Sequence, residues 1–407
     1  MFITEYGQRF DDAIDRTIMT LLGSELRMPK YSSTIRHLSA VHGGLGIKKL
    51  IHSLPQYVSS LLTACKWLET NLTIFYKMIM VSSPKQHSLL QFLKQTKPTE
   101  QLVNLHKDDA TGVNRFQLVS LIENDKIPTA KIIRLSLDLT LQDLLHNTEI
   151  PENMPSLRAW YRSQCAHGTL LWYQASTALN PYFGLTKDDF KVNVKLRLLL
   201  PLFPDITNRT WQCPCNATIP LLHGYHVLGC EKFSGLYTRR HDEVKKSVIK
   251  FLSDIGMKNG LQAEVPLKHN DSTIVADIRY IADGEKYVEV TVVGPAGERY
   301  IAAGSHSTAE AAGELAYVEK QMKYVRHDES LVSKVRYFVM EATGRIIKRS
   351  YDWIDEVSKM NQVAQTPDAT KKRARKHFLK SVSTQMARTQ AAMIRRFLDN
   401  ATLTVPV

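Results

Sequence analysis

The sequence has few cysteines and no long hydrophobic run, and both shortages exclude classes of protein. Five cysteines among 407 residues are too few and too unevenly spaced for a disulfide framework. The longest apolar runs, such as residues 195–203, are far shorter than the roughly 20 residues of a membrane-spanning helix. The N-terminus also lacks a charged stretch followed by an apolar one. We therefore expect neither secretion nor insertion into a membrane.

The composition is that of a folded, basic protein. Hydrophobic residues make up 43% of the chain, enough for two or three globular units. Lysine and arginine outnumber aspartate and glutamate by 53 to 40, which gives a net charge of +13. This balance favours polyanionic partners but is also common in proteins without them.

Residues 371–396 hold nine lysines or arginines and no acidic residue. The densest part of this segment comprises Lys371, Lys372, Arg373, Arg375 and Lys376. Such a run is typical of a nuclear import signal or of contacts to phosphates, and a solvated tail is the alternative. We expect a nuclear protein, or a cytoplasmic one if the run is not a signal.

Helical patterns dominate the first half of the chain. Apolar residues at helical spacing predict a helix from Glu5 to about Lys30, ended by Pro29. His42–Ile47, with three glycines in four residues, predicts a loop. A helical pattern resumes over 50–68, and short helices separated by prolines are expected over 85–205. The composition changes at Pro204, where we place the start of a new domain.

The second half predicts a small α/β unit. Residues 240–255 have helical spacing, and 272–293 hold two β-branched runs around a turn, which predicts a hairpin. Ser307-Thr-Ala-Glu310 matches a capping box and predicts a helix running to about Val325. Residues 335–342 predict a buried strand closed by Gly344.

Three of the cysteines fall within eighteen residues, together with two histidines. Cys213, Cys215 and Cys230 with one imidazole would supply the four ligands of a tetrahedral Zn²⁺. We favour His226 over His223, because His226 lies four positions before Cys230 on a predicted short helix. Cys213 and Cys215 are one residue apart, a tighter spacing than usual, and free cysteines are therefore the alternative.

The predicted hairpin carries Asp277 and Glu289, and its turn decides whether these carboxylates share a face. A two-residue turn pairs position 277 with 290 and separates them. A three-residue loop with Gly284 in the left-handed third position pairs 277 with 289, with Cβ atoms about 5 Å apart. We predict the three-residue loop, and with it a site for Mg²⁺ or Mn²⁺. Glu264 is a further candidate carboxylate, and solvated strand residues are the alternative.

The order of short motifs over residues 209–344 resembles the C-terminal third of LINE-type (non-LTR) retrotransposon polyproteins. The motifs are, in order, Cys-x-Cys, Gly-x-His-x-Leu-x-Cys, Arg-His-Asp, Glu-x-Pro, Ala-Asp, Val-Glu-Val-Thr-Val-Val, Ala-Glu-Ala-Ala and Lys-Gln-Met-Lys-Tyr. In that family a zinc knuckle precedes a restriction-enzyme-like endonuclease that nicks target DNA. Each motif is weak alone, and their order is the specific feature.

The resemblance implies a role for each matching residue. The expected sites are structural Zn²⁺ on Cys213, Cys215, His226 and Cys230, and catalytic Mg²⁺ or Mn²⁺ on Asp277 and Glu289. Lys320 would be the active-site lysine, reaching the site from a helix. Arg240 and His241 are candidate phosphate contacts, with a solvated arginine as the alternative.

Two departures from the family pattern bear on activity. Ala276 stands where the family has a proline, and Thr291 stands where restriction enzymes carry a lysine. They favour a catalytically inactive zinc-knuckle remnant that binds nucleic acid. A decayed polypeptide without a role is a third hypothesis, and the regular alternation of the hairpin speaks against it. Residues 26–47 resemble the linker after a reverse-transcriptase thumb, and no Tyr- or Phe-x-Asp-Asp motif occurs. A protein that starts at Met1 is therefore not expected to polymerise DNA.

The expected architecture is multidomain. It comprises a helical remnant over 1–105, a helical linker over 106–204, a CCHC zinc knuckle over 205–235, an α/β nuclease over 236–350 and a basic helical tail over 351–407. The expected partner is target DNA, and the resemblance leaves the retrotransposon's own RNA open as a second. No membrane partner is expected.

Overall fold

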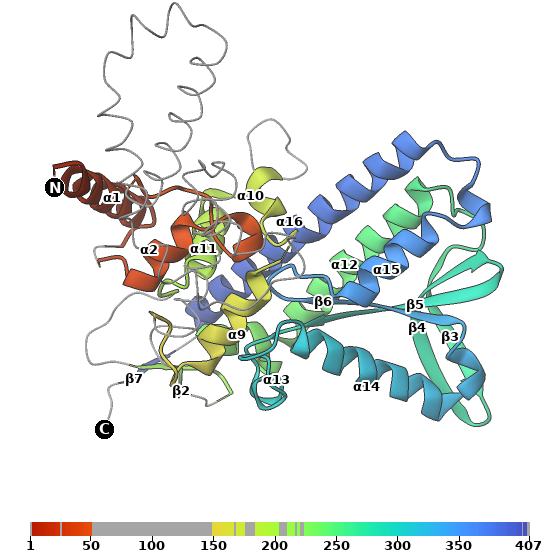
Figure 1. Cartoon of the computed structure of the whole chain (residues 1–407). Coiled ribbons are helices and arrows are strands. Elements are labelled where there is room, and N and C mark those ends of the chain that lie inside the picture. Colours follow the sequence, from red (N-terminus) through yellow and green to blue (C-terminus); the bar gives the residue numbers. More distant parts are fainter. Residues whose placement is uncertain are drawn as a thin grey trace, which may run out of the picture. The chain divides into compact units, whose positions relative to one another are not determined.

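The computed structural model describes residues 2–24, 27–50, 149–166, 168–175, 184–202, 210–215, 218–219, 224–400 and 402–404. The chain divides into two compact units, Met1–Ile150 and Pro151–Val407 (Figure 1). No helix among the described residues is long and apolar enough to cross a membrane. The helices predicted between residues 51 and 148 lie outside the described residues, as does His223.

The first unit contains helices α1 (Phe2–Leu21) and α2 (Lys30–His37) and the short helix η1 (Ala40–His42). The predicted first helix is confirmed, but the position of its end was wrong. The α1 helix stops at Leu21, and Pro29 instead precedes the first residue of α2. The fixed φ of proline suits the start of a helix as well as a stop. The loop over 42–47 is confirmed, with positive φ at Gly43 and Gly46.

The second unit combines helices with two small sheets. Its first helices are α9 (Pro155–Gln164), α10 (Leu171–Ala175) and α11 (Lys187–Arg197), and its last is α16 (Asp368–Asn400). A three-stranded sheet has the order β2 (Thr218–Ile219), β1 (Thr210–Gln212), β7 (Thr402–Thr404). Along the chain between α11 and α16, the unit also contains η4 (Gly224–Gly229), η5 (Glu231–Phe233), α12 (Ser234–Asp254), α13 (Glu298–Ala302), η6 (Glu329–Leu331) and η7 (Asn361–Val363).

The larger sheet has four strands in the order β3 (Gln262–His269), β4 (Ser272–Ala282), β5 (Gly284–Val293), β6 (Val335–Glu341). The first three are antiparallel, and β6 runs parallel to β5 after the crossover helix α14 (Ala311–His327). The α14 helix covers one face, while α12, α15 (Lys348–Val357) and α16 cover the other (Figure 1).

Alternate residues of β6 supply the two cores, as expected when successive side chains point to opposite faces. Tyr337 packs edge-on against Tyr324 of α14, with ring centroids 5.9 Å apart. Phe338 packs against Phe378 of α16, with centroids 5.6 Å apart. The unit is therefore a mixed α/β structure built on a small central sheet.

The register of the hairpin is the one predicted. Arg279 pairs with Tyr287 and Ile281 with Glu285, while Gly284 has a φ of 92°. Glycine reaches this left-handed conformation without the steric penalty of a Cβ. The last pair toward the open end of the hairpin joins positions 278 and 288, and positions 277 and 289 come directly after it.

One other prediction was wrong, and one strand was missed. The capping box does not form, because α14 begins at Ala311 and the Ser307 hydroxyl donates to the Gly304 carbonyl. Glu310 instead has a φ of 66°, and its carboxylate accepts from Arg345 and from the backbone of Lys348. Strand β3 was not predicted at all.

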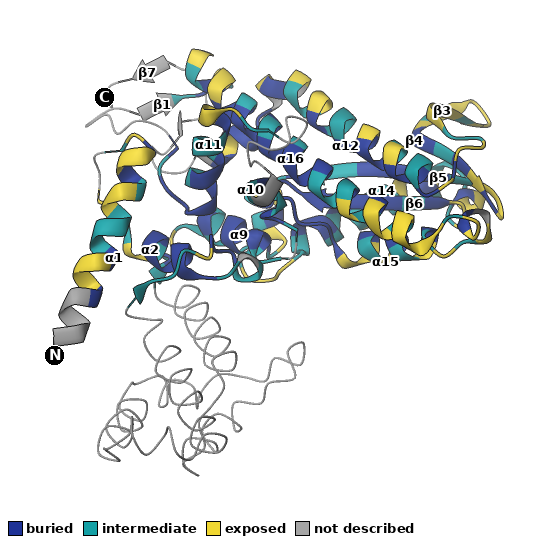
Figure 2. Cartoon of the chain, turned by 90° about the horizontal axis from the view of Figure 1, so that it is seen from above, coloured by how far each residue is buried: buried dark blue, intermediate teal, exposed yellow. Residues whose placement is uncertain are grey.

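The expected basic tail is helical but is also part of the core. Buried residues run along α16, which packs against α10, α11 and α12 (Figure 2). Polar contacts join it to these neighbours, since the Ser383 hydroxyl accepts from the Trp172 amide at 3.1 Å and Asn193 donates to the Ala387 carbonyl at 2.8 Å. The α16 helix therefore stabilises the whole second unit.

Candidate metal centre and carboxylate site

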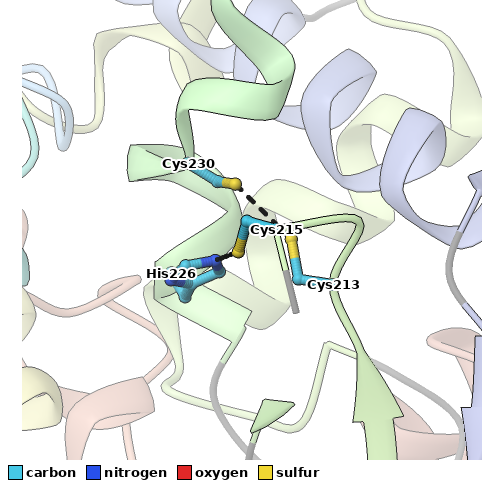
Figure 3. A group of neighbouring side chains, drawn as sticks. All are labelled: Cys213, Cys215, His226 and Cys230. Carbon is cyan, nitrogen blue, oxygen red and sulfur yellow. Dashed lines mark hydrogen bonds between the residues drawn. The ribbon is translucent and has the colours of Figure 1, made fainter. Parts of the chain in front are cut away.

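The four predicted zinc ligands lie together (Figure 3). Cys213 and Cys215 follow β1, while His226 lies in η4 and Cys230 directly after it. Their ligand atoms all lie within 4.8 Å of one another. The Cys213 and Cys230 sulfurs are 3.4 Å apart, and the Cys215 sulfur is 3.1 Å from His226 Nε2. These four side chains could hold one metal ion.

The donor set fits zinc. A tetrahedral site with Zn–S bonds of about 2.3 Å places sulfurs about 3.8 Å apart, close to the spacing found here. In the absence of a cation, burial raises the pKa of Cys213 to about 12. A bound Zn²⁺ holds such thiols as thiolates and contributes folding free energy rather than a reaction. Four protein ligands would fill the coordination sphere of such an ion, an arrangement typical of structural rather than catalytic zinc sites.

Arg240 anchors the cluster rather than facing solvent. Its side chain is 1% exposed, lies over the Tyr237 ring at 4.7 Å and donates to the Leu228 carbonyl at 3.5 Å. Burial lowers the pKa of Arg240 to about 10. A guanidinium enclosed in this way does not reach a phosphate. The predicted phosphate contact is therefore corrected to a structural link between η4 and α12.

Asp277 sits where β4 meets β5 and is 9% exposed. Its Oδ2 accepts from the Val290 amide at 2.7 Å and lies 3.2 Å from His241 Nε2. The second His241 nitrogen lies 3.4 Å from Asp242. Asp277 Oδ1 takes no hydrogen bond from the part of the chain that the structure describes. One carboxylate oxygen is thus fixed, and the other is open to a ligand.

The pKa values of Asp277 and His241 are shifted in opposite directions. Burial alone would raise the pKa of Asp277, but His241, the Val290 amide and Lys245 together lower it below its ordinary value. Burial alone would lower the pKa of His241, but its contacts with Asp277 and Asp242 raise it. Both shifts favour the charged pair, an imidazolium beside a carboxylate.

This pair predicts a pH-dependent stability. The raised pKa of His241 gives stabilisation that is complete below the unfolded value of about 6.5 and is lost as the pH rises through the folded value. The lowered pKa of Asp277 gives stabilisation that is complete above about 3.9 and is lost as the pH falls through the folded value. The pair therefore stabilises the fold most between about pH 4 and pH 6.5.

Replacement of His241 by glutamine tests this expectation. Urea unfolding of the full chain, with no added magnesium, should show that the His241→Gln variant loses more stability at pH 6 than at pH 8.5. The reason is that a larger fraction of the native imidazole is charged at the lower pH. An equal loss at both pH values would show that the pair contributes no ionic stabilisation.

Residues of the crossover helix α14 contact the Glu289 carboxylate. Lys320 Nζ donates to Oε1 at 2.6 Å, the Tyr324 hydroxyl donates to Oε2 at 2.6 Å, and Lys323 Nζ lies 3.6 Å from Oε1. The Glu289 side chain is 4% exposed and that of Lys320 is 33% exposed. Burial and the Glu289 charge raise the pKa of Tyr324 far above its ordinary value, so the phenol remains a donor.

The structure brings Lys320 to Glu289, as the resemblance implied, and adds residues that were not assigned. Tyr324 and Lys323 belong to the Lys-Gln-Met-Lys-Tyr motif, and helical spacing alone would have grouped them with Lys320 on one face. Lys245 was also missed. It forms ion pairs with Asp242 and Glu264 beside His241. No sequence pattern indicated that Lys245 would contact Glu264.

The two carboxylates are contacted from different helices. Asp277 receives its side-chain partner from α12, whereas Glu289 receives its partners from α14. Among the described residues, the Cys/His cluster is the one group of three or more potential ligands gathered closely enough for a single ion. A cation at Asp277 and Glu289 would therefore take its remaining ligands from water or substrate.

The basic run at the start of α16 is only partly available to a ligand. Lys372, Arg373 and Lys376 are exposed. Lys371 lies 3.8 Å from Asp368, and Arg375 lies 2.8 Å from Asp355. The exposed three retain the predicted capacity to contact phosphate, while the other two are engaged within the fold.

Comparison with known proteins adds no assignment. No family model matches the chain, and no curated protein matches it. The site is therefore interpreted from its own residues and their geometry.

Proposed function

We propose that this chain is a metal-dependent DNA endonuclease of the LINE-type retrotransposon class, with its catalytic cation on Asp277 and Glu289. The observation that carries the proposal is the 2.6 Å contact between Lys320 and Glu289, which are 31 residues apart. The resemblance named these two residues as partners in one site. A buried carboxylate, a lysine and a second carboxylate at the end of a strand pair suit phosphodiester hydrolysis.

The fold is compatible with this proposal. A four-stranded mixed sheet with helices on both faces carries Asp277 on β4 and Glu289 on β5. Lys320 comes from the crossover helix between β5 and β6. Rigid strands and a packed helix hold such groups more precisely than loops do. The Cys/His cluster before α12 would add a further nucleic-acid contact.

Each residue of the proposed site would have its own role in cleavage. The Val290 amide and His241 fix one oxygen of Asp277, which leaves the other for the cation. The bound Mg²⁺ or Mn²⁺ would supply an activated water and stabilise the leaving oxygen. Lys320 carries positive charge beside Glu289, where it would attract the phosphate and offset the charge that develops during cleavage.

A second candidate is an inactive nucleic-acid-binding protein, and two observations favour it. Both oxygens of Glu289 already accept hydrogen bonds, from Lys320 and Tyr324, so a cation would have to share an oxygen with one of these donors or displace it. Thr291 offers a hydroxyl where a lysine is usual, and its buried Oγ1 has no hydrogen-bond partner within the described residues. This candidate keeps the zinc cluster and the basic surface but not the reaction.

Nicking of supercoiled plasmid by the zinc-loaded full chain separates the two candidates. We expect nicking in Mg²⁺ or Mn²⁺, abolished by Asp277→Asn and by Glu289→Gln, with DNA binding retained. Asp271→Asn, at the exposed turn between β3 and β4, is the matched control and should nick normally. Binding without nicking by the unchanged chain would favour the inactive candidate.

A further inference from the structure

Two adjoining cavities form a groove between α12 and α16, away from Asp277 and Glu289. Their volumes are about 170 Å³ and about 350 Å³, and both are lined by Glu243 and Gln385. The smaller lies toward the C-terminal end of α12, beside Lys250, and the larger lies beside Arg239 and the C-terminal part of α16. The shared residues make them two parts of one groove.

Positive charge exceeds negative charge in this groove. The cations that line it are Arg239, Lys246, Lys250, Arg388 and Arg395. The carboxylates that line it are Asp189, Glu243 and Asp254.

Each carboxylate is already matched with a cation. Glu243 lies 2.9 Å from Lys246, Asp254 lies 3.0 Å from Lys250, and Asp189 pairs with Arg395. These pairs neutralise most of the groove's charge but hold three of its cations in place. Arg239 and Arg388 are the two cations of the groove that take no part in these three pairs.

Arg239 is the more exposed of these two arginines. It is exposed, and its side chain makes no ion pair or hydrogen bond with the part of the chain that the structure describes. Its neighbour Arg240 is buried, so the adjacent arginines have different roles. Across the groove, Arg388 donates to the Gly184 carbonyl at 2.7 Å, which fixes the direction of its guanidinium.

The α16 wall offers hydrogen-bond donors and no carboxylate. It presents His377, Ser381, Gln385, Arg388 and Arg395 to the groove. Hydroxyl, amide and guanidinium groups are those that proteins use to contact phosphate oxygens. A wall of this chemistry suits a phosphodiester backbone better than it suits a cationic or apolar partner.

The groove is elongated, which favours a polymer over a single anion. Arg239 and Lys250 are eleven residues apart on α12, a separation of about 16 Å along the helix axis. One strand of B-DNA carries a phosphate about every 3.4 Å of its axis, so about five phosphates cover that length. We propose that the α12–α16 groove binds one strand of the DNA backbone, with Arg239 and Arg388 as its principal phosphate contacts.

The choice of DNA rests on the proposed function, whereas the groove and its charge do not. The test measures affinity of the zinc-loaded full chain for a fluorescent 30-base-pair duplex over a series of salt concentrations. Each lost phosphate contact should reduce the slope of log K against log salt by about 0.9. We expect Arg239→Ala combined with Arg388→Ala to reduce the slope by about 1.8 and to weaken binding at low salt.

Control variants test whether the loss of DNA affinity is specific to the groove. Lys268→Ala combined with Lys334→Ala removes the same charge from exposed positions outside the groove, and should leave the slope unchanged. Arg239→Glu tests the groove without touching Arg388, in case that residue is needed for folding, and should weaken binding further than Arg239→Ala. A slope that is unchanged in the groove variants, or no DNA binding by the unchanged chain, would overturn the proposal.

Failure of the groove is distinguishable from failure of the nuclease. Asp277→Asn should abolish nicking with the affinity and the salt slope intact, because Asp277 does not line the groove. If Asp277→Asn nicks like the unchanged chain, the nuclease proposal fails and the groove is judged on binding alone.

Discussion

The Cys230→Ser variant is expected to lose its zinc and the fold of the residues around it. Cys230 is 3% exposed and lies 3.4 Å from the Cys213 sulfur, so a serine oxygen there is a poor replacement for a thiolate. Structural zinc sites contribute on the order of 10 kcal/mol of folding free energy at neutral pH. The effect should therefore be large, and a chelator should reproduce it in the unchanged chain.

The zinc cluster also supports contacts beyond its four ligands. Tyr225 stacks on Trp160 of α9, with ring centroids 4.9 Å apart, and Arg240 donates to Leu228 within η4. Loss of the metal should release these contacts and change tryptophan fluorescence. Zinc content is measured by native mass spectrometry, and proteolysis reports local unfolding.

Cys165→Ser is the matched control for this experiment. Cys165 ends α9 and donates to the Tyr161 carbonyl at 3.2 Å, outside the metal cluster. A serine hydroxyl can make the same hydrogen bond, so one zinc per chain should remain. Unchanged zinc in Cys230→Ser, or equal loss in both variants, would contradict the assignment of the ligands.

The Lys320→Met variant is expected to nick DNA at least about 100-fold more slowly, the usual cost of removing one charge-stabilising donor. The fold should persist, because Tyr324 and Lys323 still face Glu289 after the substitution. Methionine also preserves much of the volume of the lysine chain. Initial rates on supercoiled plasmid, compared with thermal unfolding of the same samples, measure the effect.

Lys323→Met supplies the comparison within the same helix. Lys323 Nζ is 3.6 Å from Glu289, against 2.6 Å for Lys320, and its side chain is 42% exposed. Its loss should therefore slow nicking much less. Equal rates in the two variants, or a rate unchanged by Lys320→Met, would remove Lys320 from the proposed active site.

Local rules predicted the hairpin and the grouping of the Cys/His cluster well. The spacing of Ala282 to Gly284 determined the register, because a three-residue loop with a left-handed glycine allows one pairing. The cysteines were grouped correctly because three thiols close in sequence must be close in space. The choice of His226 depended on a helical turn before Cys230, and η4 supplies that turn.

Tertiary packing decided what the sequence could not. Arg240 and Arg239 are alike in sequence, and only the position of the Leu228 carbonyl and of Tyr237 makes one of them buried. The α16 helix was expected to be a tail, because its core face includes Ser381, Ser383 and Thr384, whose burial no hydropathy pattern indicates. The contact of Glu289 with Lys320 forms because the crossover helix α14 lies over the sheet. The position of α14 depends on the packing of both cores, which sequence patterns do not give.

The central claim is that Asp277 and Glu289 hold a divalent cation, and Mn²⁺ binding measured by electron paramagnetic resonance tests it most directly. The experiment uses the zinc-loaded full chain, with Asp277→Asn, Glu289→Gln and the Asp271→Asn control. We predict one Mn²⁺ per chain in the unchanged protein and in the control, and its loss in the other two with zinc content unchanged. Mn²⁺ binding that survives both substitutions, or is absent from the unchanged chain, would contradict the account.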